Sequence, residues 1–257
     1  MQPSFIEGNR GRILCLHGFS GTPYELKPLS TRLGALDYTV STPVLIGHGK
    51  TTQQLADSRW PDWLMSAKDA FDELSEGKYP VTVIGFSMGG LLALKLAHER
   101  GALVRGTAVL APAYRINPLD ELQLRVLRKI GVLPWLPALP KRNGPDISKA
   151  DVRDSMPSHS HIPLSAAASI LDGQREVESI VERILSPTWI FQGRGDHTVS
   201  KTSAQQLYEK LRCREKRLLF YPRSWHILTL DVEGDQVCQD VEGFIEMLHD
   251  EHREDQK

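Results

Sequence analysis

The pentapeptide Gly85-Phe86-Ser87-Met88-Gly89 follows the G-x-S-x-G pattern, in which a serine occupies a sharp turn between a strand and a helix. Glycine at both ends leaves room for the close backbone contacts of such a strained turn. The apolar run Val81–Ile84 before it is typical of a buried strand, and Leu91–Ala97 after it is typical of a helix. We therefore predict that Ser87 is a nucleophile, placed where the helix dipole stabilises developing negative charge.

A serine hydroxyl becomes a good nucleophile only when a neighbouring base takes its proton, and an acid must orient that base. In folds with this serine turn, the chain order is Ser, then Asp or Glu, then His. Asp196 lies in a glycine-rich loop directly after the apolar run Trp189–Gln192, and His226 lies in a short loop before the last helical segment. The sequence therefore predicts that His226 is the base and Asp196 its orienting acid. Asp231 and Asp235 come later and are expected to cap the last helix.

Acyl transfer also needs hydrogen bond donors for the oxyanion of its tetrahedral intermediate. One donor is expected from the loop after the first strand, where Leu16-His17-Gly18-Phe19 ends, and the other from the residue after the nucleophile. The sequence therefore predicts that the backbone N–H groups of Phe19 and Met88 form the oxyanion hole. The side chain of Phe19 is expected to form part of the pocket wall.

These residues must be positioned by strands and helices, and the sequence alternates between the two. Short apolar runs bounded by turn residues alternate with stretches at helical spacing, which is typical of βα units on a mainly parallel sheet. The predicted strands are Arg12–Leu16, Thr39–Pro43, Val81–Phe86, Gly106–Ala111, Pro187–Gln192 and Arg217–Tyr221. The predicted helices of this core are Pro23–Leu33, Asp62–Leu74, Met88–Glu99, Ser203–Leu211 and Gln236–Leu248.

Residues 113–185 interrupt this alternation, because they show helical patterns and no strand pattern. Loops longer than about 15 residues are uncommon, so a helical insertion is the expected structure. We therefore predict a core formed by residues 1–112 and 186–257, with residues 113–185 as a helical cap. The helical and proline-rich segments of this cap are Leu119–Ile130, Val132–Pro140, Pro163–Leu171 and Val177–Ile184.

Composition excludes several classes of protein. The chain has 257 residues with a net charge of −1, which argues against a dedicated surface for nucleic acid or anionic membranes. The three cysteines show no CxxC spacing, so neither a disulfide framework nor a zinc site is indicated, and Cys15 is expected in the core. No apolar run approaches the roughly 20 residues that span a bilayer. Because Met1–Arg12 is polar and lacks the pattern of a signal peptide, we expect a cytoplasmic protein.

The motifs in combination resemble the small bacterial carboxylesterase and monoacylglycerol lipase family of α/β-hydrolases, from about Phe5 to the final helix. This resemblance implies a mostly parallel central sheet flanked by helices, without the first strands of larger members and with a small helical cap after the sixth core strand. The segment Leu119–Pro145 is longer and richer in leucine and proline than the family leads us to expect. The motifs are Leu16-His17-Gly18-Phe19-Ser20-Gly21, Gly47-His48-Gly49, Trp60-x-x-Trp63, Gly85-Phe86-Ser87-Met88-Gly89-Gly90, Asp196-His197-x-Val199 and Trp225-His226-x-x-Thr229-Leu230-Asp231.

The resemblance assigns the triad and oxyanion roles to the same five residues and implies hydrolysis of short- to medium-chain acyl esters or monoacylglycerols. The expected mechanism is two-step acyl transfer on a small-molecule substrate, without a metal or organic cofactor. The apolar cap is expected to form an acyl pocket, with Trp135 or Leu136 near its mouth. Such a cap would contact lipid surfaces transiently, but no basic amphipathic helix predicts stable anchoring.

Other functions share these residues. Thioesterases, prolyl peptidases and carbon–carbon bond hydrolases use the same triad, and the resemblance alone sets them aside. A non-catalytic module that binds a ligand in the same fold is a further alternative, disfavoured because all three triad residues are present. Epoxide and haloalkane hydrolases are disfavoured, since they carry an aspartate where Ser87 stands.

Overall fold

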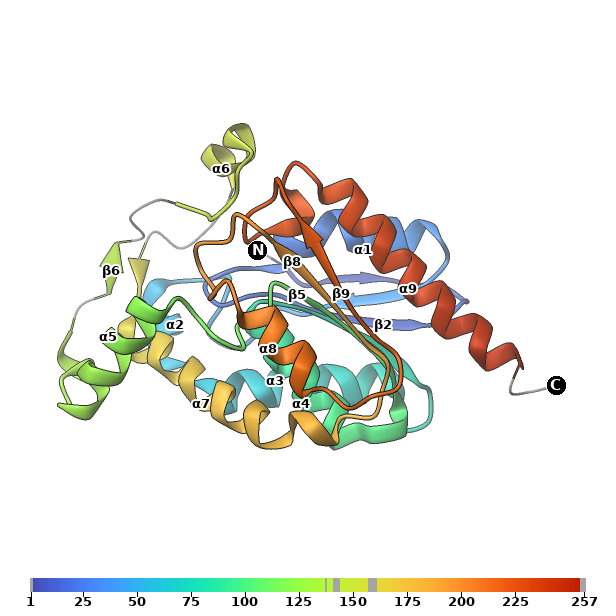
Figure 1. Cartoon of the computed structure of the whole chain (residues 1–257), viewed down its shortest axis with the longest axis horizontal. Helices are drawn as coiled ribbons and strands as arrows, with labels where there is room; N and C mark the ends of the chain where they lie inside the picture. The colour runs from blue at the N-terminus through green and yellow to red at the C-terminus, as the bar shows by residue number, and fades with distance from the viewer. Residues whose placement is uncertain (1, 137, 141–143, 157–160, 255–257) are drawn as a thin grey trace.

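The predicted strands form one sheet, seen edge-on in Figure 1. The computed structural model describes residues 2–136, 138–140, 144–156 and 161–254. Within them, the sheet has seven strands in the order β1-β3-β2-β4-β5-β8-β9, and only β1 runs antiparallel to its neighbour, β3. The strands are β1 (Ser4–Ile6), β2 (Arg12–Leu16), β3 (Thr39–Thr42), β4 (Val81–Phe86), β5 (Val104–Leu110), β8 (Thr188–Gly193) and β9 (Lys216–Tyr221).

The sheet separates two hydrophobic cores. Side chains alternate between the faces of a strand, so Leu14 and Leu16 of β2 pack into one core while Ile13 and Cys15 pack into the other. Cys15 is fully buried, as the sequence predicts. Every residue of the central strand β4 is buried, which explains why its sequence contains no charged residue.

Helices cover both faces of the sheet (Figure 1). Helices α1 and α9 lie on one face, and α3, α4 and α8 lie on the other. Helix α2 is short and begins with a capping box in which Thr51 and Gln54 bond each other's backbone. The helices of the core are α1 (Lys27–Ala35), α2 (Thr52–Asp57), α3 (Trp60–Ser75), α4 (Met88–Arg100), α8 (Ser203–Lys210) and α9 (Gly234–Glu254), with 3₁₀ turns at Pro23–Leu26, Gly101–Leu103, Val181–Arg183 and Leu228–Leu230.

The segment between β5 and β8 carries the inserted helices. The strand before the insertion, β5, is the fifth strand in chain order. The sixth place implied by the resemblance counts a leading strand of larger members of the family. The elements are α5 (Pro118–Lys129), a 3₁₀ turn at Leu133–Trp135, α6 (Ala150–Ser155) and α7 (Leu164–Ile180), together with the short strands β6 (Leu139–Pro140) and β7 (His161–Ile162). Pro137 of the predicted proline-rich segment lies outside the described residues.

Two details of this segment differ from the sequence prediction. β6 and β7 pair antiparallel, although no strand was expected there, because two-residue strands carry no periodic pattern. The two predicted helical stretches are one helix, α7. Two residues at its centre pack inward: Gly173 lies against the ring of Trp60, and the amide of Gln174 donates to the carbonyl of Ala113.

Helix α7 belongs to both the insertion and the core. Its residues Ala166, Ile170 and Val177 pack into the core between α3 and α4, while Leu164 and Leu171 pack into a smaller apolar cluster with α5. Figure 1 shows α7 alongside α3 and α4, with α5 and β6 extending beyond them. The boundaries 113–185 of a cap therefore stay a prediction. Within the described part of the chain, no helix combines the length and apolar character required to cross a membrane.

Candidate active site

Three parallel strands, β4, β8 and β9, end at the same edge of the sheet, and the predicted triad residues follow them. Ser87 follows β4, Asp196 lies in the loop after β8, and His226 lies in the loop after β9. The Nε2 atom of His226 is 3.0 Å from the Ser87 hydroxyl oxygen. Its Nδ1 atom is 2.7 Å from a carboxylate oxygen of Asp196. All three side chains are buried, and the structure brings them into one hydrogen-bonded row.

Ser87 has a backbone conformation that only close packing explains. Its φ of 53° lies in the left-handed region, which residues with a side chain seldom adopt. Its N–H donates to the carbonyl of Leu110 at 2.9 Å, which fixes the turn to the end of β5. A Cβ on Gly89 would overlap the carbonyl oxygen of Leu16, and one on Gly85 would overlap the backbone of Gly89. The two glycines of the motif are therefore required by the contacts of the turn.

Asp196 accepts hydrogen bonds from several directions. One carboxylate oxygen accepts from the N–H groups of Thr198 and Val199, both at 2.9 Å. The other accepts from Gln192 at 2.9 Å as well as from His226. Burial alone would raise the pKa of Asp196, but the charge and hydrogen bond of His226 and these donors hold the pKa below its ordinary value. Asp196 therefore stays ionised.

His226 responds to the same pair of effects with the opposite sign. Burial disfavours its charged form, but the charge and hydrogen bond of Asp196 outweigh burial and raise the pKa of His226 above its ordinary value. An ionised carboxylate can only accept, so Nδ1 carries the hydrogen and Nε2 is free to accept from Ser87. The arrangement can therefore take a proton from the serine hydroxyl.

The loop after β2 lies beside the serine. A Cβ on Gly18 would lie 3.2 Å from the Cβ of Ser87, so the predicted Phe19 donor comes from a loop in contact with the nucleophile. Met88 is the first residue of α4, where N–H groups lack acceptors within the helix. Among the described residues, the N–H groups of Phe19 and Met88 donate to no protein acceptor. Both are thus available to a bound oxyanion.

Two residues that the sequence analysis does not assign hold this loop. The Nδ1 of the buried His17 donates to the Gly18 carbonyl, and its Nε2 accepts from Leu45 at 3.1 Å. Burial lowers the pKa of His17 to about 4, so the ring is neutral and keeps both bonds. Glu25 is buried, and its carboxylate accepts from the Gly18 N–H at 3.0 Å. No local pattern marks a glutamate for this role.

The side of the site beneath the insertion is apolar. Phe19 packs against both the main core and the cluster shared by α5 and α7, and its place in a pocket wall stays a prediction. Trp135 is 86% exposed, and both Trp135 and Leu136 lie outside that cluster. Their place at the mouth of an acyl pocket stays a prediction. A hollow of about 680 Å³ lies at the opposite edge of the sheet, and the described residues that line it include none of Ser87, Asp196 and His226.

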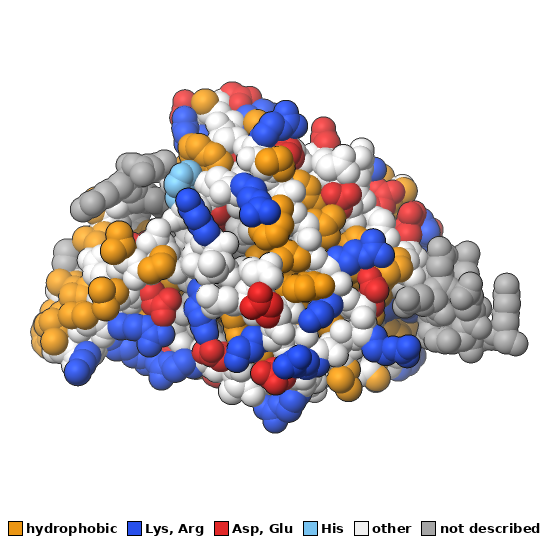
Figure 2. Space-filling model, viewed as in Figure 1, with side chains coloured by type: hydrophobic (Ala, Val, Ile, Leu, Met, Phe, Trp, Pro, Cys, Tyr) orange, Lys and Arg blue, Asp and Glu red, His pale blue; other side chains and the backbone are white. Residues whose placement is uncertain are grey.

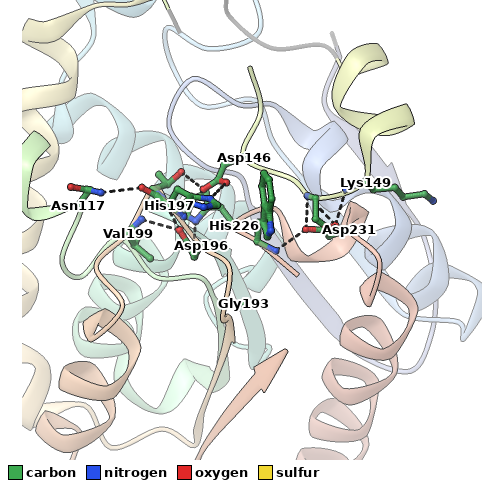
Figure 3. Close-up of polar contacts among 12 residues, drawn as sticks. Asn117, Asp146, Lys149, Gly193, Asp196, His197, Val199, His226 and Asp231 are labelled. Carbon is green, nitrogen blue, oxygen red and sulfur yellow. Dashed lines mark hydrogen bonds and ion pairs between the residues drawn. The ribbon is translucent and has the colours of Figure 1, made fainter. Parts of the chain in front are cut away.

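Asp231 has a different role from the one expected. The sequence predicts that it caps the last helix, but its carboxylate accepts from Ser148 and Lys149 of the insertion and from the N–H of Trp225 (Figure 3). The prediction was wrong because these partners lie up to 83 residues away in the chain and leave no local pattern. Asp235 lies in the first turn of α9, where a negative charge complements the helix dipole.

The strand order, the serine turn and the hydrogen-bonded Ser-His-Asp row define a hydrolase of the α/β-hydrolase fold. The chain belongs to the serine aminopeptidase (S33) family, which matches residues 7–233. It is 29% identical to a carboxylesterase of Bacillus subtilis (strain 168) over 96% of this chain and 97% of the relative. It is 26% identical to a thermostable monoacylglycerol lipase of Bacillus sp. (strain H-257), over 93% and 91% of the two chains.

A similar solved structure supports the same placement. It comes from work on LipS and LipT, two metagenome-derived lipolytic enzymes, and superposes with a TM-score of 0.87. It is 29% identical to this chain and covers 96% of it, while this chain covers 97% of that structure. These values confirm the α/β-hydrolase fold over nearly the whole chain.

Proposed function

We propose that the protein is a serine carboxylic-ester hydrolase in which Ser87, His226 and Asp196 form the catalytic triad. The observation that carries this proposal is the continuous row of hydrogen bonds from Asp196 through His226 to the Ser87 hydroxyl. The family is named after a peptidase activity, but the two relatives described above are a carboxylesterase and a monoacylglycerol lipase. Esters are therefore the favoured substrates.

The mechanism is acyl transfer in two steps. His226 takes the proton of Ser87 as the serine attacks the ester carbonyl, and Asp196 stabilises the imidazolium that forms. The N–H groups of Phe19 and Met88 hold the oxyanion, and His226 returns the proton to the leaving alcohol. Water then attacks the acyl-serine by the same route. The name of one relative favours monoacylglycerols as substrates. Short- to medium-chain acyl esters follow only from the resemblance of the sequence motifs.

We also propose brief contact between the insertion and a lipid surface that contains substrate. Leu119, Leu122, Val126 and Ile130 are exposed on one face of α5, and Trp135 extends the apolar area, which gathers at one end of the molecule in Figure 2. Helix α5 carries charges of both signs, so attraction to an anionic surface is weak. The contact is accordingly transient.

The test is hydrolysis of p-nitrophenyl esters across acyl lengths by the wild type and by Ser87→Ala. The variant should lose activity by at least roughly 10³-fold, because the acyl-enzyme cannot form. A matched control is Ser179→Ala, an exposed serine on α7, which should keep full activity. A fluorophosphonate should label the wild type and Ser179→Ala, but not Ser87→Ala.

The same panel includes acyl thioesters and aminoacyl amides. Preference for a thioester or an amide over every ester would replace the ester proposal with a thioesterase or a peptidase. A wild type that neither hydrolyses any substrate nor reacts with the fluorophosphonate would favour a binding module. Full activity of Ser87→Ala would overturn the assignment of the nucleophile.

A further inference from the structure

One residue of the insertion, Asp146, bonds both loops that carry the acid–base pair (Figure 3). One oxygen of its carboxylate accepts from the His197 N–H at 2.9 Å and from the Thr198 hydroxyl at 2.8 Å. The other is 3.0 Å from Nδ1 of the His197 ring. Its backbone carbonyl accepts from the N–H groups of His226 and Ile227 at 3.2 and 3.1 Å. The side chain thus holds the acid loop, while the backbone holds the base loop.

The residues next to these bonds are the ones that the chemistry depends on. His197 and Thr198 directly follow Asp196, and the N–H of Thr198 also donates to the Asp196 carboxylate. A shift of His197 would therefore move the acid. The His197 ring also packs edge-on against Trp225, the residue before His226, with ring centres 4.7 Å apart. Asp146 and His197 together span the gap between the two loops.

The charge of Asp146 also acts on His226. The Asp146 side chain is only 14% exposed, so its carboxylate is poorly screened by water. Three carboxylates raise the pKa of the buried His226: Asp196 most strongly, then Asp146 and Glu25. The His197 ring lies against the Asp146 carboxylate, and a further carboxylate, that of Asp231, accepts from the N–H of Trp225 beside His226.

We propose that Asp146 is a positioning residue for the acid–base pair, which fixes the Asp196 loop relative to the His226 loop and stabilises the positive charge on His226 during turnover. This inference rests on the proposed function. Asp146 contacts neither the Ser87 hydroxyl nor the reacting ring nitrogen, so it acts through the residues that it holds. Ser148 and Lys149 strengthen the arrangement through Asp231, which also accepts from Trp225 at 2.7 Å.

The test measures kcat and KM against pH on a soluble p-nitrophenyl ester for Asp146→Asn and Asp146→Ala. Asparagine keeps the shape and the backbone carbonyl but removes the charge, so the acidic limb of kcat/KM should move to lower pH. Alanine also removes the hold on His197 and Thr198, so kcat should fall about tenfold to a hundredfold with KM changed less than threefold. The control is Asp154→Asn, since Asp154 lies in the same insertion and its side chain is 80% exposed.

The possible results distinguish a positioning role of Asp146 from a purely structural one. An acidic limb that shifts in Asp146→Asn but stays in place in Asp154→Asn supports the proposal. Wild-type kcat and an unchanged acidic limb in both Asp146 variants overturn it, as does a loss of kcat in Asp146→Asn that comes with a lower melting temperature and no shift of the limb. If Asp146→Ala fails to fold, Asp146→Asn still gives the answer. A wild type inert to esters and to the fluorophosphonate would refute the proposed function instead.

Discussion

Ser87 is held in a conformation that costs free energy, and its neighbours maintain it. A non-glycine residue in the left-handed region costs on the order of 1–3 kcal/mol, so the surrounding contacts must compensate. Here the bonds to Leu110 and Ala113 fix both sides of the serine peptide. Because the backbone of Ser87 is fixed in this way, its hydroxyl already faces His226.

At the same scale, the charges around His226 predict the pH dependence of activity. The base must be neutral to take the serine proton, and Asp196 raises the pKa at which it becomes neutral. The acidic limb of kcat/KM should therefore have its midpoint above 6.5, the ordinary pKa of histidine. A pH profile on a soluble ester checks this.

The matched variant for this prediction is Asp196→Asn. It should move the limb to lower pH and reduce kcat by about 10³- to 10⁴-fold, because the neutral amide no longer stabilises the imidazolium. A wild-type midpoint below 6.5 would mean that burial, and not Asp196, dominates the pKa of His226.

Helix α7 packs closely against α3 at Gly173, which has no side chain and lies against the ring of Trp60. A Cβ on Gly173 would lie 2.6 Å from the Trp60 ring, so the two helices approach more closely than alanine permits. Gly173→Ala should therefore lower stability by about 1–3 kcal/mol, although alanine is the better helix former. Thermal unfolding measures this.

Gly243 of α9 provides the control, because a Cβ there would meet no atom within 4 Å. Gly243→Ala should raise stability by up to about 1 kcal/mol, through lower entropy of the unfolded chain. An equal gain from Gly173→Ala would show that α7 does not need the close approach.

The sequence predicts an element well when the pattern of apolar residues within that element reflects its burial. Strands β4 and β8 are buried along their whole length, so their apolar runs identify them directly. Strand β1 was not predicted: it has three residues at the sheet edge, and Phe5 is 65% exposed. An edge strand this short carries no pattern that separates it from a loop.

The candidate site divides in the same way. Ser87, Asp196 and His226 were predictable because each directly follows or closely follows a strand, in a fixed chain order. Asp146 and Asp231 were not, since their bonds between the insertion and the core join residues 51 to 83 positions apart, and no spacing along the chain records such bonds. Their roles follow from three-dimensional proximity alone.

For the whole molecule, the exposed apolar face of α5 predicts a difference between dispersed and dissolved substrates. Replacing Leu122 and Val126 with glutamine should remove about 1–2 kcal/mol of lipid contact, because part of two apolar side chains stays in water. Activity on monoacylglycerol in vesicles should then fall about tenfold, while activity on soluble p-nitrophenyl acetate stays the same.

Met65→Gln serves as the control, because Met65 is an exposed apolar residue on α3, outside the insertion. It should leave both activities unchanged. Equal loss on vesicles from this control, or no loss from the α5 variant, would argue against a lipid-facing role for α5.

The hydrogen bonds of Asp146 and Asp231 limit how the insertion can be exchanged between related proteins. Because the insertion supplies one carboxylate and the core supplies the other, neither part carries the complete set of bonds alone. Exchange of residues 113–185 for the equivalent stretch of a relative would therefore replace only one side of these hydrogen bonds. A chimera should keep its turnover only if the donor brings an acidic residue at the place of Asp146 and the host keeps Asp231. We therefore expect that the insertion cannot be exchanged independently of the loops that carry Asp196 and His226.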